Sequence, residues 1–470
     1  MKLQLSDIEG ISGIKVVNPE AAAKRFSGVS IDSRKCGKND LFFAIKGEKF
    51  DGHDFLNDVL TRGTKCAVVN EKWYRKNLKN TKRSFKNKCF IVVKDTEIAL
   101  GEISRVYRIK FVIPVIAVSG SNGKTSTKDF IAEVLSAKYN VLKTVGNLNN
   151  QIGVPLTLFR LRDEHEIAVI EVGTNHFGEV EKLCRICEPQ FGIITNIGKE
   201  HLEFLKDING AAKAEGELVE YLSEVYGTFF LNNDDRYLRK YRKYKNIKKF
   251  SFGFTGRADV TAKVKGFKKF FPVIEINLRG KKIIAQLNNI GYQSSKAALC
   301  AAALGSYFEV PVHDIKKRIA GYRIESNRRN QLKSINGVWV IDDTYNSNPD
   351  SVKAALENLK AYNTGGSKYI VLADMLELGT AGKKEHFAAG KLVKQMKFDN
   401  LLTYGRESIL TFKGAKGIKN NFYFDDKQSL LSYLNITLKK GDIILVKGSR
   451  SMKMEEIAEN ISIINLLKII

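Results

Sequence analysis

A glycine-rich stretch between an apolar run and a helical pattern carries the clearest chemistry in the sequence. The apolar run starts at Val115 and passes into small and polar residues, namely Ser119, Gly120, Ser121, Asn122, Gly123, Lys124, Thr125 and Ser126. Glycines let backbone N–H groups approach phosphate oxygens, and the start of a helix adds partial positive charge. Lys124 would reach the outer phosphates, and Thr125 would offer its hydroxyl to Mg²⁺. The stretch predicts a nucleoside triphosphate site. Its spacing is two residues shorter than the common phosphate loop, and the alternative is an ordinary strand–helix turn.

Further polar groups follow the strands predicted on either side of this loop. Glu171 ends an apolar run and is placed to hold Mg²⁺ directly or through water. A turn dense in side-chain amides, which includes Asn147 and Asn150, could donate to phosphates or to a peptide. His201 follows the strand expected at residues 191–198. A lone histidine is more often structural than a ligand, but this one follows a strand end of the nucleotide-binding sheet.

Three regions of α/β pattern divide the chain, which suits a length of 470 residues. We expect a small α/β unit at residues 1–108 and a phosphate-loop unit with a mostly parallel sheet at residues 109–311. A third, Rossmann-like unit is expected at residues 312–470, with polar clusters after three of its strands. In open α/β sheets the ligand lies outside the carboxyl ends of the strands, so these clusters point to a binding edge.

The first unit holds two polar turns that could bind a ligand or could be structural. One contains Ser30, Asp32, Ser33 and Arg34, and the other contains Asp51, Gly52 and His53. Binding residues often lie on such turns. Taken alone, the first turn could be a local ion pair, and His53 could be a structural histidine.

Composition excludes several classes of protein. Hydrophobic residues make up 43% of the chain, which excludes general disorder, and no apolar run reaches the length of a membrane span. The N-terminus carries early acidic residues and no apolar signal core. Six cysteines in so long a chain do not make a disulfide framework, and Cys184 and Cys187 are interpreted as packing residues. A cytoplasmic location is expected.

The formal net charge of +26 is spread widely along the chain. Local basic clusters occur at residues 236–249 and 265–269, and we interpret them as solvated surface. A nucleic-acid binder would concentrate its charge in a patch or an arm. Nucleic acid is therefore not expected as a partner, whereas small polyanionic substrates fit a positive field.

Taken together, these segments resemble the Mur ligases, the ATP-dependent amino-acid and peptide ligases of bacterial cell-wall synthesis. The resemblance rests on residues 119–125, 146–150, 342–349, 374–379 and 447–452. The shortened phosphate loop is the form that this family uses. The match is closest to the branch that joins D-alanyl-D-alanine to a UDP-N-acetylmuramoyl-tripeptide. The resemblance implies that the tripeptide carboxylate attacks ATP to give an acyl phosphate, that the dipeptide amine then attacks, and that ADP and phosphate leave.

The resemblance also implies roles for single residues. Lys124, His201 and Arg328 would be catalytic, with Arg328 reaching the γ-phosphate from the third unit. Two Mg²⁺ ions would be held by Thr125, Glu171, His201 and Glu215. Asp343 and Asn346 would lie by the ribose and phosphates, and Gln293 near the adenine. The substrates would be held by the two turns of the first unit and by Asn147, Asn150, Asn348, Lys447, Ser449 and Arg450. A monomer is expected.

The sequence departs from the family pattern at Glu215. Many members carry a lysine fourteen residues after the histidine, carbamylated so that it becomes a metal-binding carboxylate. Here that position is Glu215, and Lys213 precedes it by two residues. Residues two apart on a helix point about 200° apart, so only one of the two can face the metals. We expect Glu215 to act directly.

Two alternatives stay open at this stage. The chain could be a sister ligase that adds an amino acid to a UDP-muramoyl-dipeptide or glutamate to folate. It could also be a P-loop ATPase or switch protein. The sequence leaves undecided whether the tripeptide ends in lysine or diaminopimelate, how adenine is held, and whether the units are open or closed.

Overall fold

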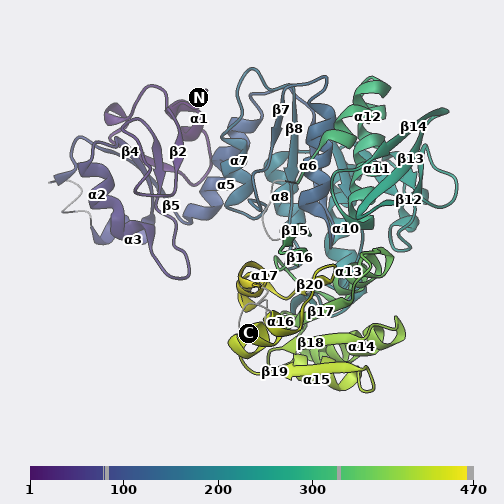
Figure 1. The fold of residues 1–470 in the computed structure, drawn as a ribbon. Coiled ribbons are helices and arrows are strands. Elements are labelled where there is room, and N and C mark those ends of the chain that lie inside the picture. The colour runs from purple at the N-terminus through teal and green to yellow at the C-terminus, as the bar shows by residue number, and fades with distance from the viewer. Residues whose placement is uncertain (78, 80–83, 325–329, 463–470) are drawn as a thin grey trace.

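The computed structural model describes residues 1–77, 79, 84–324 and 330–462, and within them three sheets form, of five, nine and six strands. Figure 1 shows the purple first unit beside the teal central unit, with the green-to-yellow third unit below. The predicted α/β fold with three domains is confirmed. No helix of the described residues is long and apolar enough to cross a bilayer.

The first sheet is mostly parallel, in the order β1-β5-β4-β3-β2, with β1 antiparallel to β5. Its strands are β1 (Lys15–Val17), β2 (Val29–Ser30), β3 (Leu41–Phe43), β4 (Cys66–Asn70) and β5 (Cys89–Val93). The helical elements of this unit are α1 (Leu5–Glu9), η1 (Pro19–Ala21), η2 (Gly52–Phe55), α2 (Leu56–Thr61), α3 (Glu71–Lys76) and α5 (Thr96–Arg108). Every residue of β3, β5 and the first four positions of β4 is buried, which explains their continuous apolar character.

The central sheet has the order β14-β13-β12-β11-β10-β9-β6-β8-β7, and its strands are parallel from β7 to β12. The parallel strands are β6 (Val115–Ser119), β7 (Val141–Lys143), β8 (Ile167–Glu171), β9 (Phe191–Ile194), β10 (Thr228–Asn232), β11 (Lys248–Gly253) and β12 (Val260–Lys268). An antiparallel extension follows, made of β13 (Phe271–Leu278) and β14 (Lys281–Gln286). Because β6, β8 and β9 are neighbours, the loops after them meet at one edge.

Helices pack against the central sheet. They are α6 (Lys124–Leu135), α7 (Gly153–Leu158), α8 (Glu179–Cys187), α9 (Leu202–Leu205), α10 (Ile208–Glu224), η3 (Leu238–Lys243), α11 (Gly291–Tyr307) and α12 (Val312–Gly321). Ile315 and Ile319 of α12 are buried in the same core as α6 and α11. The packing therefore places α12 with the central unit, although the sequence pattern assigned it to the third. Cys184 and Cys187 are buried on α8, as their interpretation as packing residues predicts.

The third sheet has the order β15-β16-β20-β17-β18-β19 and is parallel apart from β15. Its strands are β15 (Gln331–Ile335), β16 (Val338–Asp343), β17 (Lys368–Ala373), β18 (Asn400–Tyr404), β19 (Asn420–Phe424) and β20 (Ile443–Lys447). Its helical elements are α13 (Pro349–Ala361), η4 (Gly379–Ala381), α14 (Gly382–Gln395), α15 (Ser408–Gly414), α16 (Lys427–Thr437), η5 (Arg450–Met452) and α17 (Glu455–Asn460). The Rossmann-like pattern predicted for this unit is confirmed.

Apolar packing joins the first unit to the central one through α5. Leu100, Ile103 and Tyr107 of α5 are buried in one continuous cluster that holds Leu41 and Phe43 of the first sheet. The same cluster holds Leu158 of α7 and Leu183 of α8. The third unit shares a core with fewer central residues, among them Leu202 and Phe270. The apolar core between the first and central units is therefore larger than the one between the central and third units.

We predict that Ile103→Ala destabilises the protein by about 2–5 kcal/mol, because it leaves a cavity in this shared core. Urea unfolding followed by circular dichroism measures the change. Ile98 lies on the same helix with 63% of its surface exposed, so Ile98→Ala is the matched control and should change stability little. Equal effects of the two substitutions would contradict the packing described for α5.

Candidate active site

The glycine-rich stretch folds as a loop between β6 and α6, as predicted. Gly120 has a φ of +119°, and a β-carbon there would lie 2.6 Å from the backbone nitrogen of Thr195. Gly123, with a φ of +79°, precedes the first residue of α6. Both positions therefore need glycine, one for close approach and one for a left-handed turn. The loop presents backbone N–H groups at a helix N-terminus, which is a site for an anion.

Lys124 begins α6 and lies among carboxylates. Its ammonium donates to the carbonyl of Gly120 at 2.6 Å and lies 3.5 Å from Oε2 of Glu200. Burial alone would lower the pKa of Lys124, but the carboxylates of Glu200, Glu215 and Glu171 outweigh it and raise the pKa. Lys124 is therefore held in its charged form, as a phosphate-binding role requires.

Three buried carboxylates surround this lysine, and each keeps one oxygen without a hydrogen-bond partner in the described part of the chain. The oxygens are Oε2 of Glu171, Oε1 of Glu200 and Oε1 of Glu215. Oε1 of Glu171 accepts from the hydroxyl of Thr125 at 3.1 Å and from the amide of Asn149 at 2.9 Å. The ammonium of Lys128 lies 4.0 Å from Oε2 of Glu171. Buried acceptors normally have hydrogen-bond partners, so the free oxygens of Glu200 and Glu215 in particular point to a ligand that supplies positive charge.

Glu215 and Lys213 point in different directions from α10. The hydroxyl of Ser119 and the backbone N–H of Gly120 both donate to Oε2 of Glu215, the latter at 2.8 Å. Burial raises the pKa of the Glu215 carboxyl. Lys213 is exposed and its ammonium lies over the ring of Phe177, 5.7 Å from the centroid. Glu215 is thus the one of the two that faces the loop, as the helix geometry predicts.

His201 lies where the central and third units meet. Its Nδ1 lies 2.7 Å from Oε2 of Glu377, which comes from the third unit. The hydrogen bond from His201 lowers the pKa of Glu377. If Nδ1–H donates to this carboxylate, Nε2 is left as an acceptor, 4.0 Å from Oε2 of Glu200. A carboxylate that orients a histidine in this way is typical of metal-binding histidines.

A cleft of about 700 Å³ opens at the edge where these groups gather. Most predicted site residues line it, namely Ser121, Asn122, Gly123, Lys124, Thr125, Ser126, Asn147, Asn150, Glu171, His201, Gln293, Asp343, Asn346, Asn348 and Lys447. Ser119, Gly120 and Glu215 are not among the described lining residues and lie behind the loop. Within the described residues, no three His, Cys, Asp or Glu side chains converge closely enough to hold a metal by themselves.

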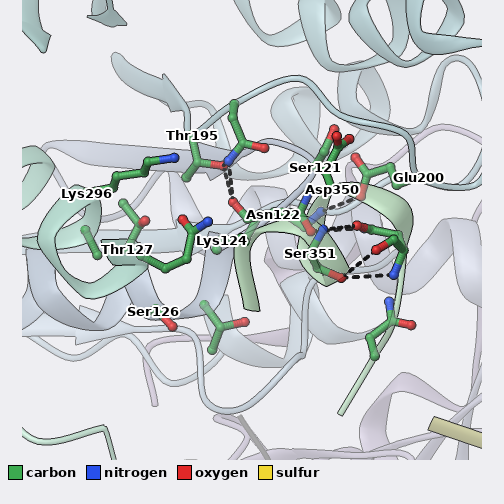
Figure 2. Close-up of a pocket in the computed structure, with 18 of the residues that line it drawn as sticks. Ser121, Asn122, Lys124, Ser126, Thr127, Thr195, Glu200, Lys296, Asp350 and Ser351 are labelled. Atoms are coloured by element: carbon green, nitrogen blue, oxygen red, sulfur yellow. Dashed lines mark hydrogen bonds and ion pairs between the residues drawn. The ribbon is translucent and has the colours of Figure 1, made fainter. Parts of the chain in front are cut away.

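The third unit closes over the phosphate loop. The amide of Asn348 donates to the side-chain oxygen of Asn122 at 3.0 Å. The backbone N–H of Lys199 donates to Asp350 at 2.6 Å, and its ammonium donates to Glu385, also at 2.6 Å. Figure 2 shows Asp350 and Ser351 alongside Ser121 and Asn122. The units are therefore in a closed arrangement, which the sequence could not decide.

Lys447 is buried and holds a turn of the third unit. Its ammonium donates to Asp343 at 2.7 Å and to the carbonyl of Asn346 at 2.9 Å. In this structure Lys447 therefore fixes two residues that were predicted to lie by the nucleotide. Nearby, the hydroxyl of Ser449 accepts from the backbone N–H of Leu376 at 2.9 Å.

A second cavity of about 610 Å³ adjoins the first and shares His201 and Asn346 with it. Its lining also includes Glu377, Ser449 and Arg450. The guanidinium of Arg450 lies over the ring of Tyr345, 5.4 Å from the centroid. A cationic side chain at the wall of this cavity suits a ligand that carries a carboxylate.

The polar turns of the first unit are held by internal bonds. Arg34 donates twice to the carboxylate of Asp32, each time at 2.9 Å, and this bonding lowers the pKa of Asp32 to about 2. The hydroxyl of Ser30 donates to the carbonyl of Asp32 at 3.0 Å. Asp32 also accepts the backbone N–H of Arg34, so the local ion pair considered from the sequence is present. Ser33 lies within the same turn.

His53 is buried, and both of its ring nitrogens are used within the first unit. Nδ1 lies 2.6 Å from Asp51, and Nε2 accepts the backbone N–H of Asn70 at 2.9 Å. A β-carbon on Gly52 would lie 2.7 Å from the backbone nitrogen of Ile45. These contacts support a structural role for His53. Asp51 keeps partly exposed oxygen atoms that a substrate could reach.

Some functional groups escaped prediction, and one predicted residue lies outside the structure. Arg328 is not among the described residues. Glu200 was missed as a charged neighbour of Lys124, although it directly precedes His201. Asn149 was missed as the partner of Glu171, although it lies in the amide-rich turn, and Glu377 was missed as the partner of His201. The sequence places Glu200 and Asn149 next to predicted site residues, but only the fold shows which side chains they contact.

Models of three Mur ligase domains match the chain. The Mur ligase family catalytic domain matches residues 25–108, the Mur ligase middle domain residues 118–305, and the Mur ligase glutamate ligase domain residues 327–450. The chain belongs to the Mur ligase family and is an ATP-dependent ligase.

Particular relatives carry a more specific name. UDP-N-acetylmuramoyl-tripeptide–D-alanyl-D-alanine ligase of Bacillus subtilis is 32% identical over 450 residues, which is 95% of each chain. The ligase of the same name from Escherichia coli is 32% identical and covers 91% of this chain and 92% of its own. The structure of MurF from Acinetobacter baumannii is similar with a TM-score of 0.88, 27% identity and coverage of 98% and 99%. MurF ligase from Thermotoga maritima in complex with ADP gives a TM-score of 0.80, 25% identity and coverage of 92% and 96%.

We predict that Lys124→Ala lowers ATP-dependent turnover by at least about a hundredfold, because it would remove the cation expected to face the phosphates. ADP release measures the change, and circular dichroism checks the fold. Lys182→Ala, an exposed lysine on α8, is the control and should leave turnover unchanged. Near-normal ADP release by Lys124→Ala would rule out this site.

Proposed function

We propose that this protein joins D-alanyl-D-alanine to a UDP-N-acetylmuramoyl-tripeptide. The observation that carries the proposal is the likeness to ligases of that name over 95% of the chain, at 32% identity. The convergence of the phosphate loop, the amide turn and the third-unit residues on one cleft supports it. Similarity limited to the phosphate loop would fit any P-loop ATPase. The similarity to these ligases extends over all three units.

ATP would lie in the larger cleft, with its phosphates on the loop. Lys124 and the N-terminus of α6 would neutralise the phosphate charge, and Asp343 and Asn346 would contact the ribose and phosphates. Gln293 would lie near the adenine. The tripeptide carboxylate would attack the γ-phosphate to give an acyl phosphate, which the dipeptide amine then attacks. Arg328 would contact the γ-phosphate.

The residues present fit the two Mg²⁺ ions that we propose. Glu171 with Thr125 would hold one ion, and His201 the other, with the orphaned oxygens of Glu200 and Glu215 nearby. Oxygen donors of this kind, completed by phosphates and water, are the ligands that Mg²⁺ prefers. When bound, the ions would neutralise charge on the transferred phosphate. Glu215 would then act directly, in place of a carbamylated lysine.

The two substrates would approach from opposite sides of His201. The second cavity, with Arg450 and Ser449, would hold the dipeptide, and Arg450 would receive its carboxylate. Asn147 and Asn150 line the larger cleft and would contact the tripeptide, together with Asn348. The turns at Ser30–Arg34 and Asp51–His53 would hold the UDP end. We propose that the first unit, at about residues 1–108, binds UDP and that the central unit binds ATP. The third unit would close over the site.

Substrate dependence of ADP release tests the function. We expect ADP release only when UDP-N-acetylmuramoyl-tripeptide and D-alanyl-D-alanine are both present, because the acyl phosphate is consumed by the dipeptide. Tripeptides ending in lysine and in diaminopimelate are compared in parallel. Turnover with a UDP-muramoyl-dipeptide and a single amino acid would favour a sister ligase. Turnover with ATP alone would favour an ATPase.

A second prediction concerns Glu215 and Lys213. We expect Glu215→Gln to weaken Mn²⁺ binding, followed by electron paramagnetic resonance, by about tenfold, because it removes one negative charge beside the ions. Lys213→Ala should bind Mn²⁺ as the unaltered protein does, since Lys213 points away from the loop. A carbamate on Lys213 in the intact mass, with loss of Mn²⁺ binding in Lys213→Ala, would reverse the assignment.

A further inference from the structure

The segment between β10 and β11 is strongly basic, and the proposed ligase chemistry does not use it. Residues 236–249 contain no acidic side chain and eight cations, which are Arg236, Arg239, Lys240, Arg242, Lys243, Lys245, Lys248 and Lys249. Leu238 and Tyr241 are buried and fix η3 against the protein. Seven of the eight cations are exposed, Lys249 being half-buried. The segment is thus an ordered basic surface.

These eight cations lack acidic partners. In the described part of the protein, none of them lies within the 4.0 Å of a carboxylate oxygen that marks an ion pair. Arg239 and Arg242 donate instead to the carbonyl and side-chain oxygens of Asn233, at 3.0 and 3.1 Å. These acceptors are neutral. Carboxylates do lie nearby, because Asp235 accepts the backbone N–H groups of Tyr237 and Leu238, but no carboxylate of the described residues forms an ion pair with the eight cations. Elsewhere on the surface ion pairs are common, as between Arg185 and Glu181.

An exposed apolar turn lies beside the basic segment. Val225 and Tyr226, between α10 and β10, are 44% and 73% exposed. The backbone N–H of Lys248 donates to the carbonyl of Gly227 at 2.9 Å, and the hydroxyl of Ser223 donates to the carbonyl of Lys245 at 3.3 Å. These bonds hold the turn next to the cations. We call Val225, Tyr226 and residues 236–249 the basic face.

Tyr226 occupies a position that usually takes glycine. Its φ is +53°, and it follows the last turn of α10, where Gly227 N–H donates to the carbonyl of Leu222 at 2.8 Å. This is the helix-ending motif in which glycine or asparagine relieves strain. A tyrosine here is strained, as is Glu188 at the end of α8, and unlike that residue it exposes a large ring to water, 73% of its surface. Its ring is available to a partner.

Val225, Tyr226 and the end of the basic segment at Lys248 lie away from the phosphate loop, whereas Arg239 and Arg242 bond to Asn233, just past the carboxyl end of β10. β10 is parallel to β9, and β9 is parallel to β6. The turn at Tyr226 precedes β10 and lies at the amino ends of these strands, while the phosphate loop follows the carboxyl end of β6. A partner bound at the turn would therefore leave the ligase cleft open.

We propose that the basic face binds the surface of an anionic lipid bilayer. Tyr226 and Val225 would enter the interfacial region, where an aromatic ring with a polar tip is favoured. The lysines and arginines around them would contact the lipid phosphates. A nucleic acid fits less well, because single strands need successive rings along a groove. Here Tyr241 is buried, Tyr237 bonds to Arg236, and Tyr244 is 38% exposed but packs edge-on against Tyr241, so the rings do not form a continuous row.

Co-sedimentation of the full-length protein with vesicles tests the proposal. We expect binding to phosphatidylcholine vesicles that contain about one third phosphatidylglycerol, and little binding to phosphatidylcholine alone. Lys243→Glu, Lys245→Glu and Lys248→Glu together should weaken binding at least about tenfold. The matched control is Lys413→Glu, Lys416→Glu and Lys419→Glu, which changes the net charge equally at exposed sites of the third unit. It should bind nearly as the unaltered protein does.

A second variant tests the ring. Tyr226→Asn keeps a residue that tolerates a positive φ and should weaken vesicle binding about threefold, most clearly at high salt, with no change in charge. All variants should release ADP from soluble substrates at the normal rate. Equal binding to both kinds of vesicle, or equal losses in the two triple variants, would overturn the proposal. Tighter binding to single-stranded RNA than to anionic vesicles, lost in the first triple variant, would also overturn it.

Discussion

A local excess of negative charge around Lys124 is the constraint on which the rest of the structure depends. Its ammonium faces the buried carboxylates of Glu171, Glu200 and Glu215, and each of the three keeps an oxygen without a hydrogen bond in the described part of the chain, although Lys128 lies 4.0 Å from that of Glu171. Burying carboxylates without counter-charge is unfavourable, so such a group is stable only when it is organised to receive cations. Glu215 also binds the backbone at Gly120 and so links this charge to the shape of the loop. The shape of the phosphate loop therefore depends on the same carboxylate that contributes to the local charge.

Side chains of the third unit position residues of the central unit in the candidate active site. Glu377 orients His201, and Asn348 reaches Asn122 of the loop, so two residues predicted to bind the nucleotide or its metals depend on side chains from across the cleft. Lys447 in turn holds Asp343. Closure of the third unit thus sets the geometry of the site as well as its isolation from water. Because His201 also borders the second cavity, the two cavities meet at a residue that closure positions.

Much of this could be predicted from the sequence, because the strands, the glycine turn and the polar residues at strand ends have local patterns. Helix geometry predicted that only one of Lys213 and Glu215 faces the loop, and the family resemblance favoured Glu215. The pairings of Lys199 with Glu385 and of His201 with Glu377 could not be predicted, because they join residues 186 and 176 positions apart. The packing of α12 against the central unit could not be predicted for a related reason, since alternation of strands and helices does not say which sheet a helix covers. The role of His53 could not be predicted either, because a histidine can serve packing or binding and the sequence does not distinguish the two.

The continuous core through α5 has a consequence for cooperativity. Because one apolar cluster spans the first and central sheets, neither unit can lose its packing without exposing the buried surface of the other. The third unit shares only a smaller set of apolar residues with the central one, including Leu202, Phe270 and Ile290. In calorimetric terms, the first and central units would melt as a single transition, and the third would be the one part able to melt separately. A chain with three domains would then behave as two thermodynamic units.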